Sequence, residues 1–567
     1  MDVVVSHDLC NEEKSFVQER LKVIDSCLRS HDIHCKSSAP PRVALLGSGG
    51  GQRADVALLG TLRQLAEENI LDAFLYLAGV SGSTWAMASL YGDPQWSRNA
   101  GAAVERALQA MSEGQSSTFS ECVQWLRQRD EQGHLSLSDF WGVVVCFSKG
   151  AMLEPRTLSE ESGEDIDATN PYQIYSAIER RRFEQKEKDL WFELSPDQAG
   201  FTCPGAFIKT SLLKQHFDAG HVTLQPERKP MDMVELQGIC GSVLASMQGD
   251  WKMFLGIIKN WVHQFFPGSS ISLSVAKRGM QQALMFLMEL VDDFDDMEAS
   301  HGVLEKLKSQ LKDDFGLISK TLIEMETTAW TVMSTEEKRE CLKLILDELA
   351  ESLKLQMVDS RARSGNPNLD GLWVITKILQ LAYSWQFGNT DNFLYNLRDS
   401  RVPKDMCERD MMHLIDAGLY LNSAYPPVLR EGRAVDIIVS FDFSEDQPFQ
   451  TLKGAMEYAA MNKRPFPTIN LSGLNEACPK PWYVFEEKGK PTVIHIPLFN
   501  RGNCKDTATI EEKRKEYRTF QMPYREPRKV QHLADLAAEN VRRSSHVILD
   551  QIQKAAERNK QQPCIIL

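Results

Sequence analysis

The residues of this chain best suited to chemistry stand in two short glycine-rich turns. The first is Gly47-Ser48-Gly49-Gly50-Gly51 and the second is Gly79-Val80-Ser81-Gly82-Ser83. The second turn departs from the G-x-S-x-G pattern only at its last position, where serine is still small. Small neighbours are needed because a serine nucleophile on a strained strand-to-helix turn packs closely against them. Ser81 is therefore a candidate nucleophile for acyl transfer.

The first turn allows three interpretations. It is not a P-loop, because no Gly-Lys-Ser/Thr follows it. Gly49 to Ala54 fits the dinucleotide pattern G-x-G-x-x-A, but that site needs an acidic residue about 20 residues further on, where Gly79-Val80-Ser81 stands instead. As an oxyanion hole, the N–H groups of Gly50 and Gly51 would hold negative charge at the start of a helix. Taken alone, the loop is equally compatible with a plain turn between a strand and a helix.

An activated serine needs a base, and the twelve histidines offer no obvious one. His413 lies in an apolar run and is predicted to be a core residue. Asp416 follows a predicted strand, Met411 to Ile415, and precedes a sharp turn, so its carboxylate would face the serine directly as the base. The alternatives are that Asp416 belongs to an ordinary turn, or that Asp442 serves instead, although its strand position favours a structural role.

The elements around these turns predict a βαβ unit. Val43 to Leu46 reads as a strand, Ala54 to Glu68 as an amphipathic helix and Leu71 to Leu77 as a second strand, so we expect a parallel sheet. Both turns would then lie at the carboxyl edge of adjacent strands, where open α/β sheets bind ligands. We also expect a strand over 435–443. Helices are expected over 11–30 and 531–557, with a helical insertion over about 275–370.

Composition limits the classes of function. The chain has 567 residues and a formal net charge of −14. This charge excludes a nucleic-acid partner, which needs a basic face, and argues against membrane attachment by bulk electrostatics. The twelve cysteines form no CxxC pair and no metal-ligand spacing, so we expect reduced thiols and no metal site. With neither a secretory signal nor a long apolar run, the sequence predicts a soluble body on the cytosolic side.

The ordered set GSGGGQRA, GVSGSTW and LIDAGL resembles the catalytic core of the group IV cytosolic phospholipase A2 family, which is related in architecture to patatin-like acyl hydrolases. Further segments of this chain are similar to family segments in the same order: WFELSPDQAGF (191–201), LQGICGS (236–242), WQFGNTDNFL (385–394), PPVLREGRAVDIIVSFDFS (426–444) and FQMPYREP (520–527). The resemblance covers roughly residues 38–560. It implies an α/β fold with a mixed, largely parallel central sheet flanked by helices. Residues 1–37 would precede this domain as a helical segment, and 561–567 would follow it as a flexible tail.

The resemblance also implies roles for individual residues. Ser81 and Asp416 correspond to a Ser/Asp catalytic dyad, and Gly50 and Gly51 to the oxyanion loop. Arg53 and Arg433 correspond to arginines that handle the phospholipid. For Arg53 the position agrees, since a guanidinium two residues past the glycines can reach a phosphate near the scissile ester. The alternative for Arg53 is a surface pair with Asp55 or Glu68.

The family's activity would be hydrolysis of fatty acyl esters of glycerophospholipids and lysophospholipids through an acyl-serine. A lysophospholipid replacing water would give transacylation. Too few residues precede the catalytic block for a C2 domain, so the resemblance is greatest to the gamma-type, calcium-independent branch, and no cofactor or metal is expected. The alternatives are a catalytically silent lipid-binding protein that keeps the fold and a soluble esterase or thioesterase.

The last four residues, Cys564-Ile565-Ile566-Leu567, form a C-a-a-X box whose final leucine favours geranylgeranyl. A chance match is the alternative. If the box is used, a prenyltransferase is a partner and Cys564 carries a lipid anchor. One lipid chain binds only marginally, so the rim of the active site would supply a second membrane contact. We expect a peripheral protein, partly cytosolic, on the cytoplasmic face of intracellular membranes such as the endoplasmic reticulum or Golgi.

Overall fold

The computed structural model describes most of the chain. The described residues are 1–35, 40–113, 117–133, 135–162, 168–223, 229–246, 367–445, 447–519, 522–524 and 526–561, with a few more between 333 and 351. They divide into two compact units. Unit 1 comprises Met1–Ser116, Trp141–Val243 and Gly388–Leu567, and unit 2 comprises Ser117–Phe140 and Leu244–Phe387. The predicted residues of the site all belong to unit 1, except Cys564, which lies outside the described residues.

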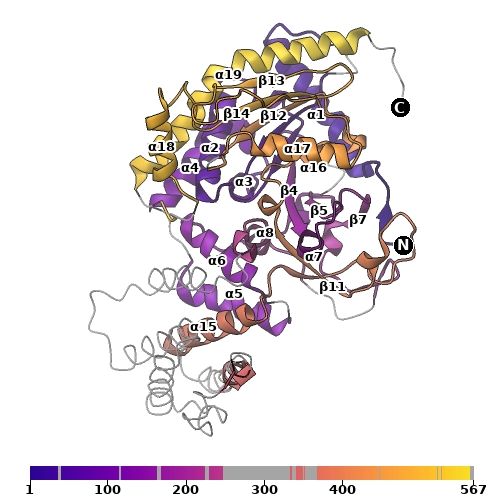
Figure 1. The fold of residues 1–567 in the computed structure, drawn as a ribbon, viewed down its shortest axis with the longest axis vertical. Coiled ribbons are helices and arrows are strands. Elements are labelled where there is room, and N and C mark those ends of the chain that lie inside the picture. The colour runs from indigo at the N-terminus through magenta and orange to yellow at the C-terminus, as the bar shows by residue number, and fades with distance from the viewer. Residues whose placement is uncertain are drawn as a thin grey trace. The chain divides into compact units, whose positions relative to one another are not determined.

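Unit 1 is built on a mixed sheet with a parallel centre, as predicted (Figure 1). The parallel strands are β14 (Thr492–Pro497), β12 (Ile437–Asp442), β2 (Val43–Gly47), β3 (Tyr76–Gly79) and β4 (Tyr172–Glu179), in that spatial order. Every residue of these five strands is buried, which explains their nearly continuous apolar sequences.

Antiparallel strands extend the sheet on both sides. β13 (Tyr483–Phe485) pairs with β14 at one edge. At the other edge the order from β4 is β5 (Trp191–Leu194), β6 (Gln198–Phe201), β7 (Ala206–Lys209) and β1 (Val4–Val5). Off this path, β11 (Met411–Asp416) pairs antiparallel with both β4 and β10 (Asn389–Asp391). The pairing of β11 with β4 is what brings the end of β11 beside the central parallel strands.

The predicted βαβ unit is present as β2, α2 (Gln52–Glu67) and β3. Its second strand is shorter than we predicted. Leu71–Ala73 forms a 3-10 turn, and the strand begins only at Tyr76. The chain must reverse direction after α2, and the apolar side chains of the turn become buried without joining the sheet, so hydrophobicity alone did not separate the turn from the strand.

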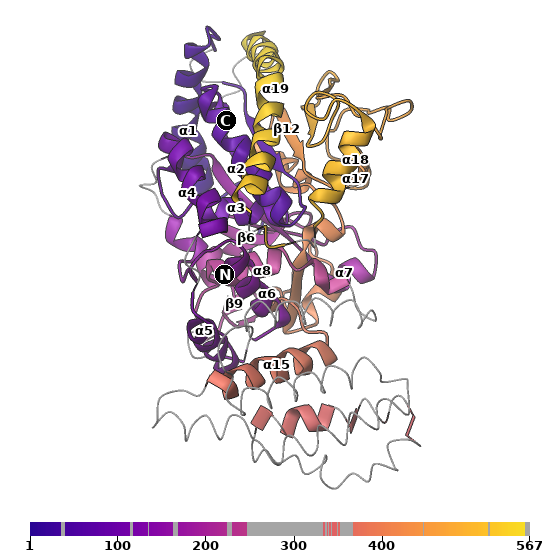
Figure 2. The ribbon, with the colours of Figure 1, turned by 90° about the vertical axis from the view of Figure 1, so that its left-hand side faces the viewer.

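The long C-terminal helix α19 (Pro527–Gln561) packs along α2, and both views show the two side by side (Figures 1 and 2). Gly60 permits the close approach, since a Cβ there would stand 2.2 Å from the carbonyl oxygen of Ala534. The helix that starts at the glycine loop is therefore held by the last helix of the chain. None of the helices among the described residues combines the length and apolar composition needed to cross a bilayer.

The N-terminal segment, which the sequence set apart as residues 1–37, belongs to the same compact unit as the sheet. Its helix α1 (Asn11–Ser30) has the predicted bounds. The Arg20 side chain is fully buried and donates to the carbonyl oxygens of Phe74 and Ala168. At the start of the helix, the Glu13 carboxylate is also fully buried, in an ion-pair cluster described below. These contacts tie the segment to the loops beside β3 and β4.

Unit 2 contains α5 (Phe119–Glu131) and α15 (Pro367–Tyr383), which pack against each other (Figure 2). Lys377 and Asp130 form an ion pair at 3.0 Å, and the Arg127 guanidinium lies 5.5 Å from the centre of the Trp373 ring. Most of the predicted insertion at 275–370 lies outside the described residues. Where residues from 340 to 351 are described, they are helical.

Candidate active site

Ser81 stands in the turn between β3 and α3 (Gly82–Leu90), with its backbone at φ 52° and ψ −126°. A positive φ is costly for a residue with a side chain and is found where the surrounding structure enforces it. One enforcing contact is visible at the next residue, because a Cβ on Gly82 would stand 1.8 Å from the carbonyl oxygen of Gly51. The serine turn and the glycine loop are therefore in direct backbone contact.

Asp416 ends β11, and its carboxyl lies close enough to the Ser81 side chain for the two to interact. Its Oδ1 also accepts from the backbone N–H of Gly418 at 2.8 Å. The carboxyl is only 1% exposed, and this burial raises its pKa from 3.8 to about 7, although its interactions with the Gly418 N–H and with Ser81 act in the opposite direction. A carboxyl that titrates near neutral pH and lies beside a serine side chain is suited to take and return the serine proton.

The glycine loop leads directly into α2. Gly51 is the N-cap residue, with φ 58° and ψ −141°, a conformation open to glycine but costly for other residues. Among the described residues, no acceptor hydrogen-bonds to the N–H of Gly50 or Gly51. Free N–H groups at the start of a 16-residue helix are suited to stabilise an oxyanion.

Arg53 lies behind this loop and is fully buried. Its Nε donates to the carbonyl oxygen of Phe443 at 2.8 Å, and its Nη1 to that of Tyr517 at 2.6 Å, with the Glu445 carboxylate at 3.5 Å. The predicted alternative, a surface pair with Asp55 or Glu68, is not what the structure shows. In this position the guanidinium connects the first turn of α2 to two distant segments, and its hydrogen bonds leave it turned toward protein rather than solvent.

Arg433 takes part in a buried ion-pair cluster. Its guanidinium contacts Glu13 at 2.9 Å and Glu193 at 2.9 Å, and Arg430 also contacts Glu193 at 3.0 Å. All four side chains are 2% exposed or less. None of these partners belongs to the two glycine-rich turns or to the Asp416 turn. The structure therefore does not bring Arg433 together with the dyad, and both of its carboxylate partners are internal.

The competing carboxylate, Asp442, is occupied by other partners. It accepts hydrogen bonds from the Thr451 hydroxyl at 2.6 Å, the Ser444 N–H at 2.9 Å and the Ser48 hydroxyl at 3.3 Å. His413 lies half-buried on β11, where its ring nitrogen contacts Asn389. Asp442 therefore contacts the glycine loop through Ser48. Asp416, not Asp442, is the carboxylate beside Ser81.

Sequence reasoning missed Asn422, Glu445 and Thr519. Thr519 donates to the Glu445 carboxylate at 2.8 Å, and its carbonyl oxygen would stand 3.1 Å from a Cβ on Gly51. Asn422 contacts Gly49 with both its backbone and its side chain. None of the three lies in a recognisable motif, and only the fold brings them to the glycine loop.

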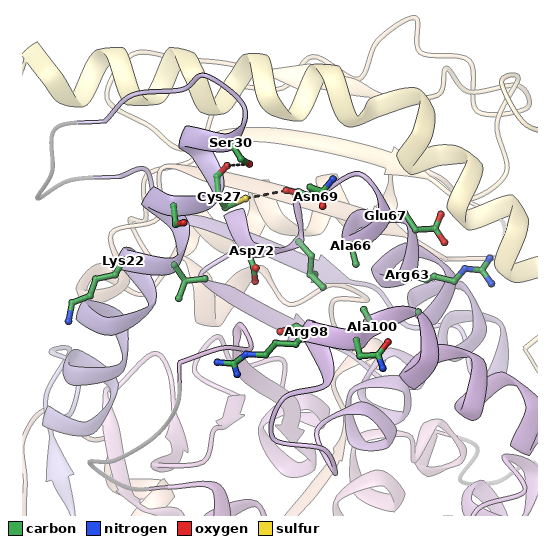
Figure 3. Close-up of a pocket in the computed structure, with 16 residues that line it drawn as sticks. Lys22, Cys27, Ser30, Arg63, Ala66, Glu67, Asn69, Asp72, Arg98 and Ala100 are labelled. Atoms are coloured by element: carbon green, nitrogen blue, oxygen red, sulfur yellow. Dashed lines mark hydrogen bonds between the residues drawn. The ribbon is translucent and has the colours of Figure 1, made fainter.

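A pocket of about 790 Å³ lies elsewhere in unit 1, between α1, the end of α2 and the start of α4 (Ala100–Glu113) (Figure 3). Its lining is mixed and includes the charged residues Lys22, Arg63, Asp72 and Arg98. Figure 3 shows the Cys27 thiol directed to the carbonyl oxygen of Asn69, at 3.3 Å. Neither residue of the dyad lines this pocket, so its size does not identify it as the catalytic centre.

Comparison with known proteins shows which family this chain belongs to. Residues 43–246 match the lysophospholipase catalytic domain. The chain is 31% identical to mouse cytosolic phospholipase A2 gamma, over 96% of this chain and 91% of that protein. The human gamma protein is 30% identical, over 98% and 96% respectively. This chain belongs to the cytosolic phospholipase A2 family. Among solved structures, the family fold is matched by human GIVD cytosolic phospholipase A2, with a TM-score of 0.65 and 20% identity over 98% of this chain and 66% of the solved chain.

Proposed function

We propose that this family member hydrolyses fatty acyl esters of glycerophospholipids and lysophospholipids, with Ser81 as nucleophile and Asp416 as base. The observation that supports this assignment best is the buried Asp416 carboxyl beside the Ser81 side chain. It stands in a chain whose relatives are named as phospholipases.

In the first half of the reaction, the Ser81 proton passes to the Asp416 carboxylate while Ser81 Oγ attacks the ester carbonyl carbon. The N–H groups of Gly50 and Gly51 stabilise the negative charge that develops on the carbonyl oxygen, and each such donor is typically worth about 3 kcal/mol or more. The carbon–oxygen bond to the glycerol then breaks, and Asp416 returns the proton to the leaving oxygen. An acyl-serine remains.

In the second half, water attacks the acyl-serine and gives its proton to Asp416, which returns it to Ser81 Oγ as the fatty acid leaves. The hydroxyl of a lysophospholipid in place of water would transfer the acyl group and form a diacyl phospholipid. The same dyad supports both outcomes, so we propose transacylation as a second activity. Neither half needs a calcium ion, and we propose that activity is calcium-independent.

We propose that Arg53 acts by holding the oxyanion loop. Its contacts to Phe443 and Tyr517 fix the first turn of α2, and the Cβ position of Gly50 lies 2.8 Å from its Nη2. Displacing the loop by even 1 Å can cost about 100-fold in rate. For a direct contact between Arg53 and a lipid phosphate, the guanidinium would have to leave these partners. Because both of its ion pairs are buried inside the protein, we assign Arg433 a structural role as well.

We also propose that a geranylgeranyl group on Cys564 anchors the protein at the cytoplasmic face of intracellular membranes of the endoplasmic reticulum or Golgi, leaving a cytosolic fraction. The support for this is the C-a-a-X box alone. Intact mass of the protein from its native cells tests it, because an unmodified Cys564 would exclude the anchor.

The main experiment is release of fatty acid from phosphatidylcholine and lysophosphatidylcholine vesicles in EGTA. We expect turnover by the wild type and none by Ser81→Ala or Asp416→Asn. An inactive wild type that still binds vesicles would favour a catalytically silent lipid-binding protein. Activity on short soluble esters without any on vesicles would favour a soluble esterase, and activity that survives Asp416→Asn would assign the base to another group, with Asp442 the first to test.

A further inference from the structure

Among the residues that the structure describes, Asn422 is the one that hydrogen-bonds both the N–H and the carbonyl oxygen of Gly49. Its carbonyl oxygen accepts from the Gly49 N–H at 3.1 Å, and its side-chain Nδ2 donates to the Gly49 carbonyl oxygen at 3.2 Å. The second hydrogen of Nδ2 is directed to the Ser444 hydroxyl at 2.9 Å. The first link is available to any residue because it uses the backbone. The second link depends on an amide at this position.

The Gly49 carbonyl and the Gly50 N–H belong to the same peptide group. In a trans peptide these two groups point in opposite directions, so holding the carbonyl oxygen fixes the direction of the N–H. A peptide between two glycines has little steric resistance to flipping, because neither residue has a Cβ. The orientation of the proposed oxyanion donor therefore rests on what binds the Gly49 carbonyl.

The other candidate donor to that carbonyl is the Ser48 hydroxyl, which is 3.3 Å from it and also 3.3 Å from the Asp442 carboxylate. A hydroxyl has one hydrogen to share between these two acceptors, and the charged acceptor binds it more strongly. The Asn422 amide is thus the donor that remains for the Gly49 carbonyl.

The rest of the Asn422 side chain lies beside the dyad. The position of a Cβ on Gly49 is 2.2 Å from Asn422 Oδ1 and 2.9 Å from Ser81 Cβ, so Gly49 is enclosed between them. A Cβ on Gly418 would likewise stand 2.7 Å from Oδ1 and 3.0 Å from Asp416 Oδ1. One amide therefore contacts the glycine loop and the Asp416 turn together.

We propose that Asn422 is a positioning residue that locks the Gly49–Gly50 peptide so that the Gly50 N–H serves the oxyanion. This inference rests on the proposed function, and it acts through Gly50 rather than on the substrate directly. Asn422→Asp is the informative variant because it keeps the shape of the side chain. It replaces the donor with an oxygen that repels the Gly49 carbonyl.

The test measures vesicle hydrolysis and the rate at which a fluorophosphonate labels Ser81. In labelling, an Oγ–P bond forms, fluoride leaves, the serine proton goes to Asp416, and the phosphoryl oxygen takes the place of the oxyanion. We expect Asn422→Asp to lower kcat about 10- to 100-fold with KM little changed, and to slow labelling in parallel. Ser444→Ala is the matched control, since it removes the other partner of Nδ2 and leaves the Gly49 link, and it should retain most of the activity.

A pH profile separates this role from a merely structural one. A protonated carboxyl can donate to the Gly49 carbonyl, so the optimum of Asn422→Asp should move to lower pH, which a variant that only folds poorly would not show. An unchanged kcat and an unchanged labelling rate in Asn422→Asp would overturn the proposal. So would a loss of activity that is no greater than the decrease in the fraction of protein that can be labelled. A wild type that is labelled but releases no fatty acid would contradict only the proposed substrate. The labelling rates of wild type and Asn422→Asp would then still test the role of Asn422. A wild type that never labels would overturn both.

Discussion

Replacing the proposed base with asparagine should inactivate the protein and at the same time stabilise its fold. Burial raises the pKa of Asp416 from 3.8 to about 7, so the folded state binds this proton more tightly than the unfolded state does. Stability therefore falls as pH rises from about 4 to about 7, and the loss remains above that range. Asparagine is uncharged at every pH, and its amide oxygen can accept the Gly418 N–H in place of the carboxylate.

The size of the effect follows from the shift. At about 1.4 kcal/mol per pKa unit, ionisation of Asp416 costs the fold about 4 kcal/mol at pH 8 and about 2 kcal/mol at pH 5. The free energy of unfolding of Asp416→Asn, relative to the wild type, should thus increase by about 2 to 3 kcal/mol between these two pH values. A stability difference between variant and wild type that is the same at both pH values comes in part from altered hydrogen bonds. The informative quantity is therefore the change of this difference with pH.

Urea unfolding followed by tryptophan fluorescence at pH 5 and pH 8 measures this difference. Ser81→Ala is the matched control, because it is expected to be equally inactive but keeps the buried carboxyl. It should follow the wild type across the pH range. A stability difference between Asp416→Asn and wild type that does not change with pH would refute the reasoning, since it would mean that the ionised carboxylate is well compensated in the fold.

Three further predictions concern other titrating or buried groups. The kcat/KM of the wild type should rise with pH through a midpoint near 7, because Asp416 must be ionised to accept the serine proton, and a flat profile between pH 6 and 8 would contradict its role as base. Asp55 is fully buried, neither of its oxygens has a hydrogen-bond partner among the residues that the structure describes, and burial raises its pKa to about 6. Asp55→Asn should therefore gain about 2 kcal/mol over the wild type as pH rises from 4 to 6 and little more above it, measured by urea unfolding; a gain already complete at pH 4 would count against it. Glu13→Gln should lower the free energy of unfolding by about 3 kcal/mol or more, because it leaves Arg433 short of a buried partner, while kcat per folded molecule stays near the wild-type value; a selective loss of kcat would instead give Arg433 a part in the reaction.

Much of the site could be predicted because its parts are local in sequence. The glycine loop and the serine turn each follow a buried strand within a few residues, so strand periodicity and small residues were enough to place them at one sheet edge. Asp416 was harder, since a carboxyl after a strand is common, and only the pairing of β11 with β4 brings it to Ser81. The family resemblance supplied what spacing alone did not.

The supporting contacts could not be predicted for a physical reason. A buried arginine and an exposed one have the same sequence signature, and burial is decided by distant partners. The sequence placed Arg53 near a phosphate, which stays a prediction, but it gave no indication that Arg53 binds the backbone at Phe443 and Tyr517. Asn422 gave no signal at all, because its role depends on one carbonyl group that lies hundreds of residues away in the chain.

The arrangement of the central strands also affects how the protein is made. β2, which leads into the glycine loop, lies between β3 and β12, and β12 is formed by residues 437–442. During synthesis one edge of β2 stays unpaired until about three quarters of the chain has emerged. The contacts of Arg53 with Tyr517 and of α2 with α19, which hold the glycine loop, can form only later. An exposed apolar edge invites pairing with other chains. Truncated or stalled chains of this protein should therefore be inactive and prone to aggregate, and efficient production should depend on chaperones that cover this edge.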